Sequence, residues 1–271
     1  MVSQEQRRRQ LAREKFLRQQ QRRTSTRRKA QMRNAVIASV LGVVVVGSVA
    51  LYTTDAFKGD DKTNANAEVS PSASASKAPD PCEKPAEGKI ASKTWKKEPA
   101  VSIDKSAKYT MKFATTCGDI DVALKASAAP HTVNSFAFLS GKGYFDHTKC
   151  HRLTTTGIYV LQCGDPTGQG NGGPGYTIPD ENLKDKSLKG NSYPKGTIAM
   201  ANTGQPHSGG SQFFLVYKDS RLPPKYTPFG TVSASGMKVL EKIAKAGEST
   251  GNGDGAPNAT VVIDKATVTK S

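Results

Sequence analysis

Short runs of alternating hydrophobic and polar residues dominate the chain from Lys108 onward. Such runs are typical of half-buried β-strands, because successive side chains of a strand point to opposite faces. The first run has a turn signal at Cys117-Gly118-Asp119, so it predicts two strands, and a Thr-rich stretch divides the second run in the same way. The runs that predict strands are residues 108–125, 150–166, 196–202, 211–217, 229–233 and 259–268.

Two segments of the same region have helical spacing instead. Residues 129–145 place Val133 and Phe136 three positions apart after a proline, and residues 236–247 form an amphipathic stretch that ends at Gly247. Many short strands with only two helices predict a mainly β fold of the α+β type, a closed or nearly closed barrel. Alternating βαβ units would need more helices between the strands.

The first 52 residues have a different pattern. Residues 1–34 hold twelve Lys and Arg against two Glu, so this tail carries +10 of the formal charge of +16. Residues 35–52 contain no charged residue, and eighteen residues in a helix rise about 27 Å, close to the thickness of a bilayer's hydrocarbon core. We therefore predict a basic cytoplasmic tail followed by one transmembrane signal anchor.

A cleaved signal peptide is the alternative to an anchor. Its basic region is usually short and its apolar region has about 7–15 residues, whereas this chain has a longer version of both and no clear Ala-x-Ala site. The positive-inside rule then places the tail in the cytoplasm and the rest outside the cell membrane. The tail's positive charges attract anionic lipid, and this role explains them better than binding to nucleic acid, for which the tail has a single aromatic residue.

The remainder divides at two changes of composition. Residues 53–80 are rich in Ala, Ser, Asp and Pro and poor in large apolar residues, which predicts a disordered linker. Residues 81–107 contain Cys82 and the only tryptophan, Trp95, so we expect an N-terminal extension that packs on the domain formed by residues 108–271.

All four cysteines follow the predicted anchor, on the side where disulfides form. Four cysteines permit three pairings, and their spacing does not decide between them. We favour Cys150 with Cys163, because a hairpin brings these two side by side, and this leaves Cys82 with Cys117.

Several motifs have ordinary explanations. Residues 168–173, GQGNGG, match a dinucleotide-binding pattern, but Pro-Gly-Tyr follows where a helix must begin. His147, Cys150 and His151 have spacing that fits zinc, but a thiol outside the cell is more often in a disulfide, so we expect no metal site. Ser208 and Ser211 lack the G-x-S-x-G frame of a hydrolase nucleophile.

Arg152 and Gln162 lie within strand-like sequence in the run CHRLTTTGIYVLQCGDP, residues 150–166. In the ordinary case both would belong to an edge strand and extend into water. However, CHR, LQCGDP, IAMAN and GSQFF occur in this order, and together they resemble the cyclophilin-type peptidyl-prolyl cis-trans isomerases over about residues 108–270. The run CHRLTTTGIYVLQCGDPTGQGNGGPGY is especially similar to exported actinobacterial members.

The resemblance implies a fold and a site. The fold is an eight-stranded antiparallel barrel closed by two helices, here preceded by the predicted transmembrane helix. Arg152 and Gln162 take the catalytic positions, and Phe214 lies under the proline ring of the substrate. The other implied substrate-binding residues are Tyr159, Val160, Ala201, Asn202, Thr203, Gln212, Leu222 and Tyr226. The family often has Trp and His where this chain has Arg221 and Tyr226, which bears on cyclosporin binding more than on catalysis.

The implied activity is peptidyl-prolyl cis-trans isomerisation of proline-containing polypeptides by a monomer, in support of the folding of exported proteins. Rotation about an X–Pro bond needs no nucleophile, metal or cofactor, so no cofactor is expected. The alternative is a non-catalytic module that captures Pro-containing peptides in the same groove. The complete set of Arg152, Gln162 and Phe214 favours the enzyme.

Overall fold

The computed structural model describes residues 79–271. The basic tail 1–34, the anchor 35–52 and nearly all of the linker 53–80 lie outside the described residues, so the expectations for these segments stay predictions. No helix within 79–271 has both the length and the apolar character that a membrane crossing requires.

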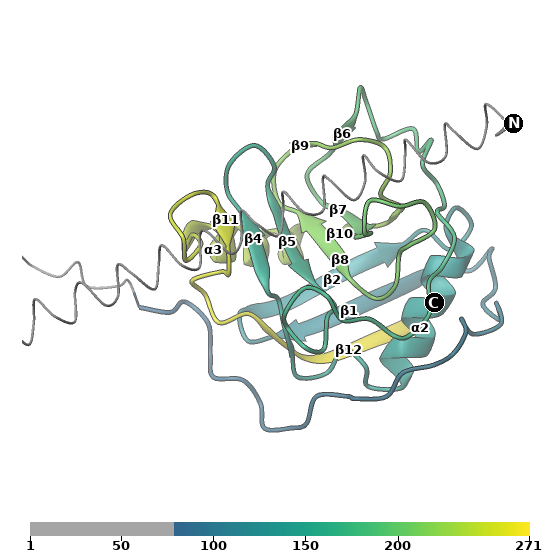
Figure 1. The fold of residues 1–271 in the computed structure, drawn as a ribbon, viewed down its shortest axis with the longest axis horizontal. Coiled ribbons are helices and arrows are strands. Elements are labelled where there is room, and N and C mark those ends of the chain that lie inside the picture. The colour runs from purple at the N-terminus through teal and green to yellow at the C-terminus, as the bar shows by residue number, and fades with distance from the viewer. Residues whose placement is uncertain (1–78) are drawn as a thin grey trace, which may run out of the picture. The chain divides into compact units, whose positions relative to one another are not determined.

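A ten-stranded antiparallel sheet forms the body of this region, in the order β11-β4-β5-β8-β7-β10-β2-β1-β12-β3 (Figure 1). Its eight longer strands are β1 (Tyr109–Thr115), β2 (Gly118–Leu124), β4 (Arg152–Thr154), β5 (Val160–Cys163), β7 (Thr197–Met200), β8 (Phe213–Val216), β10 (Pro228–Val232) and β12 (Val262–Lys270). The two-residue strands β3 (Thr148–Lys149) and β11 (Asp254–Gly255) form its edges, while β6 (Ser192–Tyr193) and β9 (Ser220–Arg221) pair separately.

The predicted mainly β fold with two helices is correct, but the closed eight-stranded barrel needs correction. The sheet gains two short strands that no hydrophobic alternation could reveal, because each has only two residues. Within 79–271 no pairing joins β3 to β11, so the curled sheet stays open between these edges.

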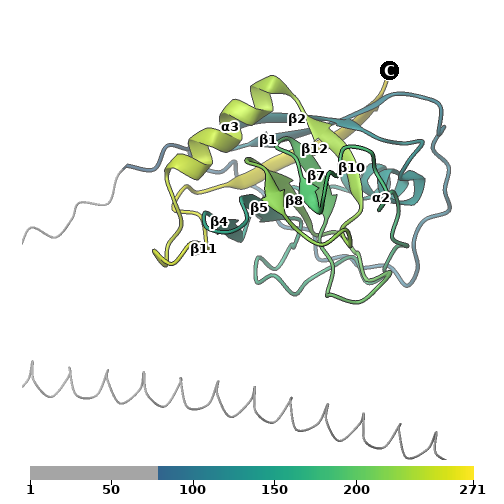
Figure 2. The same cartoon turned by 90° about the horizontal axis from the view of Figure 1, so that it is seen from above.

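The two helices lie at opposite ends of the sheet (Figures 1 and 2). Helix α2 (Pro130–Gly141) begins at a proline, as predicted, and Ala129 before it offers no capping side chain. The Glu181 carboxylate supplies the cap instead and accepts the N–H groups of His131 at 3.0 Å and Thr132 at 2.9 Å. A residue far along the chain therefore fixes the start of α2.

Helix α3 (Ala234–Lys245) begins two residues earlier than predicted. The reason is a local cap: the Ser233 hydroxyl accepts the N–H of Gly236 at 3.1 Å. Lys242 and Lys245 lie in the last turn, where positive charge stabilises the helix.

Aromatic side chains join α2 to the sheet in the core. Phe136 of α2 is fully buried and packs against Phe229 of β10, with ring centroids 4.6 Å apart, and against Phe213 of β8 at 5.6 Å. Phe213 also stacks on Phe113 of β1 at 4.9 Å. Residues that the sequence places far apart thus form one apolar cluster, which fixes the positions of the strands that support the site.

The hairpin β4–β5 has the predicted form. Arg152 and Gln162 are directly opposite each other in the antiparallel pairing. The disulfide Cys150–Cys163 closes the same hairpin, and the second disulfide joins Cys82 to Cys117. Both favoured pairings are present in the structure.

The extension, residues 81–107, contains no helix or strand. Its contacts are made by side chains and single backbone groups. Besides the disulfide at Cys82, the ring of Trp95 packs against Phe138 of α2 at 5.1 Å and against Tyr144 at 5.9 Å.

Candidate functional site

A small cavity of about 200 Å³ lies where β4, β5, β7 and β8 come together. Its lining combines five apolar residues with four polar ones, and the guanidinium of Arg152 is the charged group among them. The lining residues are Arg152, Ile158, Val160, Gln162, Ala201, Asn202, Phe214, Leu222 and Tyr226. We refer to this space as the small cavity.

Arg152 is held in place by the carboxylate of Asp254, a residue 102 positions further along the chain. Its Nε and Nη2 atoms each donate to one oxygen of Asp254 at 2.7 Å, a bidentate pair between neighbouring strands β4 and β11. Hydrogen bonding to Asp254 raises the pKa of Arg152, and the same contact lowers the pKa of Asp254. Both groups are therefore charged at neutral pH, and the plane of the guanidinium is fixed.

Gln162 continues this network. Arg152 Nη1 donates to Gln162 Oε1 at 3.2 Å, and since a guanidinium can only donate, the glutamine must present its oxygen to it. Gln162 Nε2 then donates to Gln212 Oε1 at 2.9 Å, and Gln212 Nε2 donates to the Gly172 carbonyl at 2.9 Å. One chain of contacts orients both amides and the arginine.

Phe214 forms the apolar floor of the small cavity and is 5 % exposed. Its ring lies edge-on to Tyr226 at 5.4 Å and to Tyr193 at 6.2 Å. The buried Tyr193 hydroxyl donates to the Tyr226 carbonyl at 2.8 Å and accepts the Tyr226 N–H at 3.1 Å. Burial raises the pKa of Tyr193 to about 12, so this hydroxyl stays protonated and keeps holding Tyr226 beside the cavity.

The small cavity brings together most of the residues that the sequence suggested. Thr203 and Gln212 lie instead in the neighbouring large cavity described below. Tyr159 lines neither cavity: its ring packs edge-on to Tyr217 at 5.9 Å, with Lys218 Nζ 4.5 Å from the ring centroid. Ile158 lines the small cavity in its place, together with Val160 and Gln162. Val160 and Gln162 are two positions apart in β5 and therefore lie on one face of that strand, whereas Ile158 belongs to the loop before it.

A large cavity of about 890 Å³ adjoins the small one, and Gln162, Ala201 and Asn202 line both. Its other walls come from the extension and from residues 170–177, which we call the glycine-rich loop. The lining comprises residues 96–98, 162, 170–177, 201–203, 208 and 210–212.

The glycine-rich loop is shaped by one buried carboxylate, Asp165. Its oxygens accept the N–H groups of Thr167, Gly170, Asn171 and Gly172 at 2.6 to 3.0 Å. Burial acts to raise the pKa of Asp165, but these hydrogen bonds outweigh it and the pKa is lowered. The segment therefore serves as a shaped wall of the large cavity.

Sequence reasoning missed Asp254, Ile158 and Tyr193. Asp254 is separated from Arg152 by 102 residues, and its Asp-Gly context is that of an ordinary turn, so no local signal marks it. The sequence also gives no signal for Tyr193, because its partner Tyr226 lies 33 positions away. Ile158 lies in the loop before β5, so no strand alternation marks it.

An arginine fixed at a small cavity with a phenylalanine in its lining, on a curled antiparallel sheet with two helices, defines the class of the protein. The family model for "Cyclophilin type peptidyl-prolyl cis-trans isomerase/CLD" matches residues 110–268. The match covers more than half of the chain, so the chain belongs to the cyclophilin-type peptidyl-prolyl cis-trans isomerases and is an isomerase.

Curated relatives and a solved structure agree with this family. A "probable peptidyl-prolyl cis-trans isomerase B" of Mycobacterium leprae is 44% identical over 216 residues, which cover 77% of this chain and 68% of the relative. The protein of the same name from Mycobacterium tuberculosis is 42% identical, with 76% of this chain and 65% of the relative covered. A crystal structure of a cyclophilin-type isomerase from Cryptosporidium parvum matches with a TM-score of 0.51 and 27% identity, over 60% of this chain and 99% of that one.

Proposed function

We propose that this isomerase acts on X–Pro bonds of exported polypeptides and assists their folding, with Arg152 as the electrostatic catalyst. Gln162 orients the arginine, and Phe214 with the other apolar residues of the small cavity receives the proline ring. The single observation that supports these roles best is the double restraint on the Arg152 guanidinium, by Asp254 and by Gln162, at the small cavity.

The reaction requires loss of amide resonance, a barrier of about 18–20 kcal/mol. In the twisted state the proline nitrogen becomes pyramidal and gains a lone pair that can accept a hydrogen bond. Three of the N–H groups of Arg152 are engaged by Asp254 and Gln162, so N–H groups on Nη1 and Nη2 remain for the substrate. A donor fixed in advance stabilises the twisted state more than either planar state.

The test is a peptide isomerisation assay on the full chain. Arg152→Ala should lower kcat/KM by about 10²- to 10³-fold, because the electrostatic contact exists only in the twisted state. Lys238→Ala, which removes an exposed positive charge on α3, is the matched control and should behave as wild type. Equal turnover by a folded Arg152→Ala protein would refute this role of the arginine. Absence of activity in the wild type would favour the peptide-binding module instead.

The assignment to exported polypeptides rests on the sequence before residue 53. A tail of +10 followed by eighteen uncharged residues supports a single-pass membrane protein, with the tail in the cytoplasm, near anionic lipid, and the isomerase domain outside. Protease added to intact cells should degrade residues after about 53 and spare the tail. A domain that is protected until the cells are lysed would contradict this orientation.

A further inference from the structure

The extension forms one wall of the large cavity. Lys96, Lys97 and Glu98 line this space, together with residues of the loop 170–177 and of segment 201–212. Since Gln162, Ala201 and Asn202 line both cavities, a peptide in the small cavity has neighbouring residues within reach of this wall. Each residue of an extended peptide spans about 3.3–3.6 Å, so only a few residues are needed to cross from one cavity to the other.

Contacts on one side of the two lysines hold the wall in place. The Trp95 N–H donates to the Pro174 carbonyl at 2.8 Å, and its ring packs against Phe138 and Tyr144. The backbones approach so closely that a Cβ at Gly175 would lie 2.7 Å from the Trp95 carbonyl oxygen. Lys96 therefore follows directly after an anchored residue.

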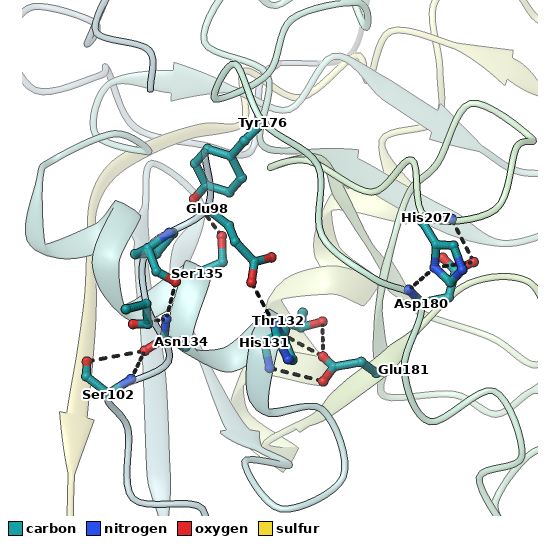
Figure 3. A network of polar contacts seen from close by, with 12 residues as sticks. Glu98, Ser102, His131, Thr132, Asn134, Ser135, Tyr176, Asp180, Glu181 and His207 are labelled. Atoms are coloured by element: carbon teal, nitrogen blue, oxygen red, sulfur yellow. Dashed lines mark hydrogen bonds and ion pairs between the residues drawn. The ribbon is translucent and has the colours of Figure 1, made fainter. Parts of the chain in front are cut away.

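Contacts on the other side attach the wall to α2, as Figure 3 shows. Glu98 Oε1 lies 2.7 Å from His131 Nδ1. Asn134 donates to the Pro99 carbonyl at 3.3 Å and to the Ala100 carbonyl at 3.1 Å, and its side-chain oxygen accepts the Ser102 N–H at 3.0 Å. Lys96 and Lys97 thus lie between two anchors, although the segment has no regular secondary structure.

The charge along this wall is not balanced. Lys96 and Lys97 are exposed, and neither has a hydrogen-bond or ion-pair partner among residues 79–271. Glu98 is the acidic residue of the lining, and its carboxylate is directed to His131. Asp165, under the adjoining loop, is engaged by four backbone N–H groups. The large cavity is therefore lined by two lysines whose charges have no partner in the part of the chain that the structure describes.

We propose that the large cavity is a subsite for an acidic side chain of the substrate, and that Lys96 and Lys97 make this isomerase prefer X–Pro bonds with Asp or Glu nearby. The proposal rests on the proposed function of the small cavity. An attraction of this kind selects among peptides and steers their approach, and it weakens as salt increases.

The experiment measures how fast the full chain isomerises each peptide of a matched set. Each is amidated at its C-terminus and carries Glu or Gln at one position, scanned over the three residues before the proline and the two after it. Exchange NMR at several peptide concentrations gives kcat/KM. At one position or more the Glu peptide should exceed the Gln peptide by about two- to fivefold for each lysine engaged, the range of partly exposed ion pairs. Raising the salt concentration from about 0.01 M to about 1 M should remove the difference.

The variant Lys96→Gln with Lys97→Gln should bring the Glu-to-Gln ratio close to one. Lys84→Gln with Lys89→Gln is the matched control, since it removes two exposed lysines of the same extension that do not line the cavity, and it should keep the ratio. The basic tail is present in every variant, so its attraction for acidic peptides cancels. Equal rates for Glu and Gln peptides at all positions in an active wild type would overturn the subsite alone, whereas no isomerisation of any peptide would overturn the proposed function.

Discussion

One disulfide closes the β4–β5 hairpin and another joins the N-terminal extension to the turn between β1 and β2, but different forces hold these two regions. In the hairpin, Cys150–Cys163 reinforces strands that already pair with each other and with β8 and β11. In the extension, Cys82–Cys117, a few side-chain contacts and single backbone hydrogen bonds act where no strand or helix exists. The difference indicates that Arg152, the proposed catalyst, stands on a cooperative part of the fold, whereas Lys96 and Lys97 stand on a part that can open locally.

The largest effect is expected from removal of the hairpin disulfide. Cys150→Ala with Cys163→Ala frees a loop of 13 residues, and the chain-entropy model then predicts a loss of about 3 kcal/mol in the free energy of unfolding. Urea denaturation followed by circular dichroism measures it. A loss well below 1 kcal/mol would mean that the strand pairing alone holds the hairpin.

Removal of the disulfide of the extension should lower the free energy of unfolding by less, although the loop that this disulfide closes is longer. Cys82→Ala with Cys117→Ala frees 35 residues, but the extension can detach while the sheet stays folded, which limits the loss to the free energy of that local opening. Hydrogen exchange should accelerate at residues 81–98 and stay unchanged in β5 and β8. Faster exchange throughout the sheet would show that extension and sheet unfold together.

The next prediction concerns kcat and tests how Arg152 is positioned. Asp254→Asn removes the charge that fixes the guanidinium and should lower kcat about tenfold, equivalent to about 1.4 kcal/mol. KM should change little, because Phe214 and the apolar lining remain. Asp254→Glu keeps a carboxylate and should restore part of kcat. A fall in stability with no change in kcat would assign Asp254 a purely structural role.

The smallest expected effect is the change of the free energy of unfolding with pH. Burial lowers the pKa of His151, and the charges of Arg152 and Lys149 add to the shift although the charge of Asp165 opposes it. Neither ring nitrogen of His151 has a partner within 79–271. Below about pH 6.5, His151 is protonated in the unfolded chain but stays largely neutral in the folded protein. The free energy of unfolding is therefore full above that pH and falls as the pH decreases. The contribution is at most about 1 kcal/mol between pH 6.5 and pH 5.5.

The measurement is the free energy of unfolding at both pH values for wild type and His151→Gln. The variant should lose less stability on acidification, since glutamine does not titrate. Lys238→Ala serves as an unrelated variant and should follow the wild type. Identical losses in wild type and His151→Gln would show that the folded protein can protonate His151 without cost.

Local patterns were sufficient for much of the fold. The alternation in residues 108–125 and 150–166 predicted two hairpins, and both are present as β1–β2 and β4–β5. The proline before residues 131–141 correctly marked the start of α2. The start of α3 was missed by two residues, because the cap at Ser233 depends on one hydrogen bond rather than on periodicity.

The sequence by itself determined the eight longer strands, the two helices, the hairpin that sets Arg152 opposite Gln162, and the family, because these depend on residues close together in the chain. Only the tertiary structure decided that Asp254 fixes Arg152, that Tyr193 holds Tyr226, and that the extension brings Lys96 to the large cavity. Such contacts join residues that are distant along the chain, and their side chains meet only because the apolar core fixes the arrangement of the strands and of α2. Periodicity reports which face of an element is buried, but it contains no information on which distant residue will lie against that face.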